Sequence, residues 1–98
     1  IRMESLLNKQ IELLANLQDI ISDKDKVTIE RGNYYLSIEK HRNKDIQITL
    51  NWNESILNTL VISYNVYDKA SAVNFYYEKD GKEDFLDIAN MLITHHEQ

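Results

Sequence analysis

The 98-residue chain has no cysteine, no proline and only two glycines, Gly32 and Gly81. The missing cysteines exclude a disulfide scaffold, a thiolate metal site and a cysteine nucleophile. Two isolated glycines cannot form a glycine-rich phosphate loop. No apolar run approaches the roughly 20 residues of a membrane span. We therefore expect a soluble chain without a membrane partner.

Hydrophobic residues make up 43% of the chain and charged residues 28%, with a net charge of −5. This balance predicts one folded domain over residues 1–98, too short for a second core. The acidic charge makes nucleic acid an unfavourable partner, because phosphates require a basic surface. The N-terminus lacks the pattern of a signal peptide, so a cytoplasmic location is expected. The abundance of Asn, Lys, Ile, Asp and Tyr is typical of an AT-rich bacterial or phage genome.

Residues 3–22 have the apolar periodicity of an amphipathic helix. The apolar half of this helix is wider than the roughly 100° stripe that one packed surface covers. Gln10 lies at its centre, where a buried amide needs a hydrogen-bonding partner. That partner is either the sheet edge or a water molecule, or else Gln10 fixes the register of a self-association seam. Gln10, Ile11 and Leu14 are therefore candidate partner-binding residues, and a homodimer through this helix is predicted.

From Lys26 to Tyr77 the apolar period is two, the pattern of strands with one buried face. Five segments alternate in this way, and short polar turns join them: residues 27–30, 34–39, 46–52, 58–67 and 72–77. Short links between successive strands predict an antiparallel meander. Asp80 and Glu83 have the spacing of a capping box at the start of a closing helix.

Two amphipathic helices and a sheet with one apolar face predict an α+β fold. The predicted architecture is a two-layer sandwich of order αβββββα, with an antiparallel five-stranded meander and the N- and C-terminal helices on one face. The predicted core consists of Leu6, Leu13, Leu17, Ile20, Ile29, Leu36, Ile48, Leu50, Leu60, Ile62, Phe75, Phe85, Ile88 and Leu92.

No residue pattern of the sequence is typical of catalysis or metal binding. His41 lies in a predicted turn, and the adjacent His95 and His96 point about 100° apart on a helix, which prevents joint chelation of one ion. The carboxylates of residues 80–87 lie where a helix begins, and the helix dipole stabilises them without any functional role. We expect no cofactor, no metal and no enzymatic activity.

Two further surfaces are candidates for recognition. Tyr35, Val61, Tyr67 and Tyr76 are predicted to lie on the outer face of the sheet, where tyrosine serves either partner recognition or cross-strand pairing. Lys40, Arg42 and Lys44 form a basic turn beside His41. This turn either binds an anion or is a solvated hairpin tip.

The sequence favours a small acidic, non-catalytic protein-binding module, such as an inhibitor, an immunity factor or a chaperone that acts on a partner protein. In that case the outer sheet face or the surplus apolar face of the first helix would contact the partner. The acidic residues 78–87 would suit a basic site on that partner. The alternative is a nucleic-acid-associated protein that uses the basic turn at residues 40–44.

Overall fold

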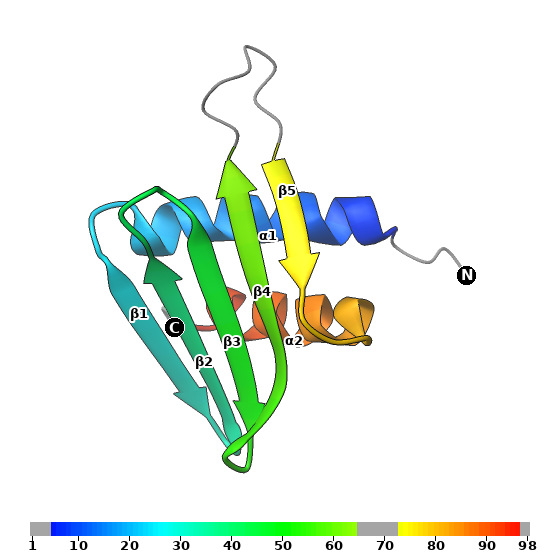
Figure 1. The fold of residues 1–98 in the computed structure, drawn as a ribbon. Helices are drawn as coiled ribbons and strands as arrows, with labels where there is room; N and C mark the ends of the chain where they lie inside the picture. Colours follow the sequence, from blue (N-terminus) through cyan, green and yellow to red (C-terminus); the bar gives the residue numbers. More distant parts are fainter. Residues whose placement is uncertain (1–4, 65–72, 97–98) are drawn as a thin grey trace.

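The computed structural model describes residues 5–64 and 73–96. It confirms the predicted α+β sandwich, in which an antiparallel five-stranded meander carries both helices on one face (Figure 1). The elements are α1 (Leu6–Ile21), β1 (Lys26–Arg31), β2 (Tyr34–Lys40), β3 (Ile46–Trp52), β4 (Ser55–Tyr64), β5 (Val73–Tyr77) and α2 (Lys82–Thr94). Strand order follows chain order, so β1 and β5 form the two edges of the sheet.

The strand β4 begins at Ser55, three residues earlier than the sequence pattern predicts. A register shift between Leu50 and Asn51 of β3 pairs Leu50 with Asn58 and Asn51 with Ile56. The bulge inserts one extra residue into β4 and interrupts the alternation from which the strand was predicted. The predicted end of this strand, at residues 65–67, lies outside the described residues.

The core lies between the sheet and the two helices, as predicted. Eleven of the fourteen predicted core residues are buried. The other three, Leu6, Phe75 and Ile88, are only half-buried and pack against the core from its margin. Phe75 is on an edge strand, so no other described strand covers its outer side. Leu86 and Ile93 of α2 are buried in addition, because α2 contacts both the sheet and α1.

The helices α1 and α2 lie side by side and run in the same direction across the sheet (Figure 1). A polar seam joins them: Asn90 donates to the Lys9 carbonyl at 3.2 Å and accepts from Asn16 at 3.2 Å.

The predicted capping box of α2 is wrong. The N-cap is Gly81, which has a φ of 81° and no side chain, and it displaces Asp80 from the capping position. Within the described residues, neither helix is long and apolar enough to cross a membrane.

Asn58 connects β4 to the segment between β5 and α2. Its side chain is almost fully buried and makes four hydrogen bonds. The amide nitrogen donates to the carbonyls of Lys79 at 3.0 Å and Asp80 at 3.4 Å. The amide oxygen accepts from the backbone N–H groups of Lys79 and Thr59, both at 2.9 Å. Asn58 thereby satisfies backbone groups that no sheet ladder reaches.

Candidate functional site

The predicted tyrosines on the outer sheet face do not form one continuous patch. Val61 of β4 and Tyr76 of β5 are direct cross-strand partners, and Tyr76 is 59% exposed. Tyr35 of β2 pairs with Glu30 and Asn51 instead, in a different cross-strand row. Tyr67 lies outside the described residues. Of the three described members of this set, the structure brings together Val61 and Tyr76, beside the β5 edge.

The first helix leaves part of its apolar surface uncovered. Leu7 and Ile11 are 63% and 54% exposed, whereas Leu14 is half-buried and packs against the core. Ile21, at the other end of the same face, is buried. The exposed apolar residues therefore gather in the N-terminal half of α1, the half that extends past the β5 edge of the sheet (Figure 1).

Gln10 finds its hydrogen-bonding partner within the molecule. The Tyr77 hydroxyl donates to the Gln10 side-chain oxygen at 2.7 Å. Tyr77 is the last residue of the edge strand β5. Among the predicted roles of Gln10, the structure therefore shows the hydrogen bond to the sheet edge. The contact anchors α1 against this edge and occupies the amide oxygen, which makes Gln10 a positioning residue of the surface.

Among the residues that the structure describes, Tyr77 has the largest shift in pKa, which predicts an effect of pH on stability. Burial raises the pKa of its phenol from 10.0 to about 12. The unfolded chain loses this proton near pH 10 and the folded chain only near pH 12, so the free energy of unfolding falls as the pH rises through this interval. Urea unfolding at several alkaline pH values should show this loss, and Tyr77→Phe should diminish it; part of the loss should persist because burial also raises the pKa of Tyr64. An identical pH dependence in both proteins would contradict the burial of the phenol.

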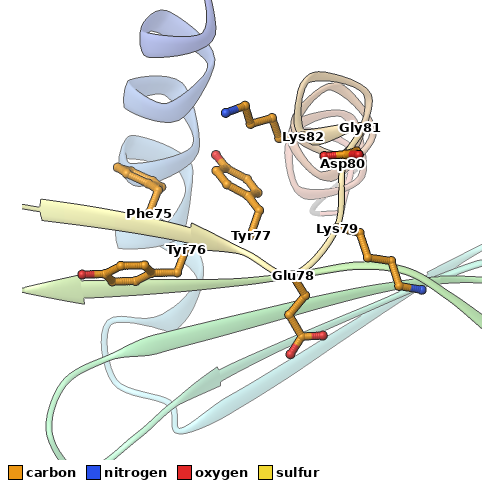
Figure 2. Close-up of a pocket in the computed structure, with 8 residues that line it drawn as sticks. All are labelled: Phe75, Tyr76, Tyr77, Glu78, Lys79, Asp80, Gly81 and Lys82. Atoms are coloured by element: carbon orange, nitrogen blue, oxygen red, sulfur yellow. The ribbon is translucent and has the colours of Figure 1, made fainter.

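The residues around the end of β5 line an open groove of about 710 Å³. Figure 2 shows Phe75 and Tyr77 on the helix side of β5, and Tyr76 and Glu78 on the opposite side. The ammonium group of Lys82 lies 5.9 Å from the centre of the Tyr77 ring, within the range of a cation–π contact. The groove is open to solvent along its length.

The structure separates the three residues of the predicted anion site. The Lys40 side chain points to the C-terminus of α1, where its nitrogen lies 3.5 Å from the Ile21 carbonyl and 3.3 Å from the Ser22 carbonyl. A cation at this place is favourable because the last carbonyls of a helix carry partial negative charge. Arg42 and Lys44 remain exposed in the turn. The candidate anion site is thereby reduced to Arg42 and Lys44.

This difference predicts unequal effects within the basic turn. Lys40→Ser should lower the free energy of unfolding by about 0.5–1 kcal/mol, because the last turn of α1 loses its counter-charge. Arg42→Ser and Lys44→Ser should each change it by less than about 0.5 kcal/mol, as exposed surface substitutions do. Urea unfolding of the three single variants measures this order. Equal effects at all three positions would show that Lys40 is as solvated as the other two.

Sequence reasoning missed the exposed apolar pair Ile56 and Leu57, which are 50% and 41% exposed beside the bulge of β4. Two adjacent apolar residues after a turn were the available signal, since simple alternation would place only one of them outside.

His95 and His96 are exposed at the end of α2. Within residues 5–64 and 73–96, no group of three His, Asp or Glu side chains is placed to hold a metal ion.

Comparison of the chain with protein-family models, with curated proteins and with solved structures gives no match.

Proposed function

We propose that this chain is a non-catalytic protein-binding module whose partner contacts the β5 side of the molecule. The β5 side comprises the edge strand Val73–Tyr77 together with Leu7 and Ile11 of α1. The observation that supports the proposal is the exposure of large apolar side chains on both sides of a sheet edge that no described strand pairs with: Leu7 and Ile11 on α1 and Tyr76 on the opposite face of the sheet are each more than half exposed. Apolar surface of this kind on a small domain usually marks an interface.

The chemistry of the same region favours binding over catalysis. The phenol of Tyr77 lies on the helix side of β5, and with a pKa raised from 10.0 to about 12 it is even less readily ionised than an ordinary tyrosine, which is already neutral at physiological pH. A neutral phenol held by Gln10 is a structural hydrogen-bond donor and a poor general base. A module of this kind would act as an inhibitor, an immunity factor or a chaperone, and the acidic residues around Glu78 and Asp80 would favour a basic partner surface.

Selection of binding peptides from a displayed random library tests this function and does not require the identity of the partner. The immobilised full chain should enrich specific peptides, and those peptides should lose affinity for a Leu7→Lys, Tyr76→Lys variant. A matched control carries Gln18→Lys and Thr28→Lys, which lie on exposed positions of α1 and of the opposite edge strand and add the same two positive charges. Peptides that bind all three proteins equally, or no enrichment at all, would contradict binding through the β5 side.

A homodimer through α1 is the second candidate use of the exposed apolar side chains. Ile11 is more than half exposed, so Ile11→Asp should give a folded monomer with a smaller sedimentation coefficient than the native dimer. Sedimentation velocity from micromolar to millimolar concentration measures the association of both proteins. A native chain that remains monomeric over this range would remove the homodimer.

The nucleic-acid alternative now depends on Arg42 and Lys44. Two exposed cations are a small footprint on a chain of net charge −5. Binding of a labelled oligonucleotide that weakens steeply between about 50 and about 200 mM salt, and that disappears in the Arg42→Ser, Lys44→Ser variant, would favour this alternative.

A further inference from the structure

The free edge of β5 presents a regular row of backbone hydrogen-bonding groups. The Glu78 N–H donates to the Thr59 carbonyl across the β4–β5 pair at 3.0 Å. Since alternate residues of an antiparallel strand direct their backbone groups to the same neighbour, those of Tyr76 and Asn74 also point toward β4. The backbone N–H and C=O groups of Val73, Phe75 and Tyr77 therefore point away from the sheet. No other described strand pairs with this edge.

The two edges of the sheet differ in how they are protected. An exposed edge invites pairing with another chain, and charged side chains on the edge strand usually prevent it. The strand β1 has three charges, at Lys26, Glu30 and Arg31. The strand β5 has the sequence Val-Asn-Phe-Tyr-Tyr and no charge. Charged side chains of the edge strand therefore oppose strand addition at β1, whereas β5 has no charged side chain with this effect.

The first helix provides a packing surface beside the β5 edge. Its contact with the sheet edge is at Gln10, which accepts from Tyr77, and the first turn of α1, at its N-terminal end, extends past β5 (Figure 1). A strand added to β5 would rest one face on this turn and on the exposed Leu7. The β5 strand of a second copy is a poorer occupant than a basic segment, because β5 has no charged side chain of its own.

Unpaired carboxylates gather where β5 ends. Glu78, Asp80, Glu83 and Asp84 are exposed, and within the described residues none of them makes an ion pair. The two lysines of this segment are engaged elsewhere: the Lys79 side chain donates to the Ile56 carbonyl at 3.0 Å, and Lys82 lies over the Tyr77 ring. The C-terminal end of β5 is therefore complementary to positive charge.

We propose that the free edge of β5 binds an extended, basic segment of a partner protein by antiparallel strand addition. This inference rests on the proposed protein-binding function and specifies its mode. Backbone groups of the segment pair with those of Val73, Phe75 and Tyr77, and its apolar side chains contact the first turns of α1. Because the added strand is antiparallel, its N-terminal end lies beside Glu78 and Asp80, and the basic residues belong at that end.

A synthetic peptide tests the proposal directly. The probe has a run of lysines followed by alternating valine and threonine, and its control has the same composition with the lysines at the C-terminus. Fluorescence anisotropy should show that the first peptide binds several-fold more tightly than the control, and that its binding weakens between about 50 and about 200 mM salt. Equal or reversed affinities would overturn the antiparallel, charge-guided arrangement.

Amide hydrogen exchange of the full chain with saturating peptide gives a readout that is specific to strand addition. The N–H groups of Phe75 and Tyr77 should become protected on binding, whereas those of Asn74 and Tyr76 should be protected with and without peptide. Binding without new protection at Phe75 and Tyr77 would overturn strand addition.

Variants at the two edges complete the test. Val73→Pro removes an outward N–H at the first position of an edge strand, where proline is tolerated, and should weaken peptide binding by about tenfold or more. The matched control is Thr28→Pro, whose N–H points outward from β1 by the same alternation, since the Lys40 N–H donates to the Asp25 carbonyl across the β1–β2 pair. Urea unfolding checks that both variants fold, and the charge reversal Asp80→Lys provides a second route if Val73→Pro does not fold. Equal affinities in all variants would overturn the inference, while library peptides that depend on Leu7 and Tyr76 would still support the protein-binding function.

Discussion

Leu13→Ala is expected to lower the free energy of unfolding by about 3–5 kcal/mol, the largest effect among the single substitutions considered for this protein. Leu13 lies in the middle of α1 and has no exposed surface. Its side chain fills the space between the helix and the sheet, so truncation removes buried methyl groups and leaves a cavity. Neighbouring side chains cannot collapse into that cavity without a shift of the helix.

Leu7→Ala is the matched control on the same helix. Leu7 is 63% exposed, so the same change of leucine to alanine should alter stability by less than about 0.5 kcal/mol. Urea unfolding of both variants, monitored by the single tryptophan and by circular dichroism, measures the difference. A small effect at position 13 would mean that α1 is rotated relative to the sheet. A large effect at position 7 would mean that this leucine is buried in solution, for example in a homodimer.

Asn58→Ala should cost about 2–4 kcal/mol, although asparagine is a polar residue. The variant loses four hydrogen bonds and leaves the buried N–H group of Thr59 and the part-buried N–H and C=O groups of Lys79 without this partner. A buried backbone group without a partner costs about 1–3 kcal/mol. Because the same bonds hold the segment between β5 and α2, peptide binding at the β5 side should also weaken in this variant.

Asn74→Ala is the control for this prediction, since Asn74 is an exposed asparagine on the adjacent strand. It should unfold within about 0.5 kcal/mol of the native chain. Asn58→Asp keeps the acceptor oxygen but turns a second oxygen toward two carbonyls, so it should be destabilised as well. An Asn58→Asp variant as stable as the native chain would show that the amide donor contributes nothing.

Much of the fold could be predicted because the meander depends on local patterns. Each strand buries one face, so a period of two identifies the strands, and short turns leave only antiparallel pairing between neighbours. The predicted start of β4 was three residues too late, because a bulge breaks this period at Leu57. The capping box at Asp80 was predicted wrongly, since spacing alone does not reveal that Gly81 adopts a positive φ and becomes the N-cap.

The candidate site was less accessible to sequence reasoning. Ile11 could be identified as surplus apolar surface from the helical wheel, and Tyr76 from strand alternation. The partners of Gln10 and Lys40 could not be identified, because Tyr77 and the C-terminus of α1 approach them only through tertiary structure. The pattern of single strands also could not show that the β5 edge is open to strand addition. This property depends on strand order, which places a strand without charged residues at the edge of the sheet.

The polar seam between α1 and α2 has a consequence for the order of folding. Every strand pairs with its neighbour in the chain, so each hairpin closes a short loop. The contacts of the seam, by contrast, join residues 74 to 81 positions apart, and closing so long a loop costs more chain entropy. We therefore expect the hairpins to form first and the contacts between the two helices to form last, after the C-terminal helix has been synthesised.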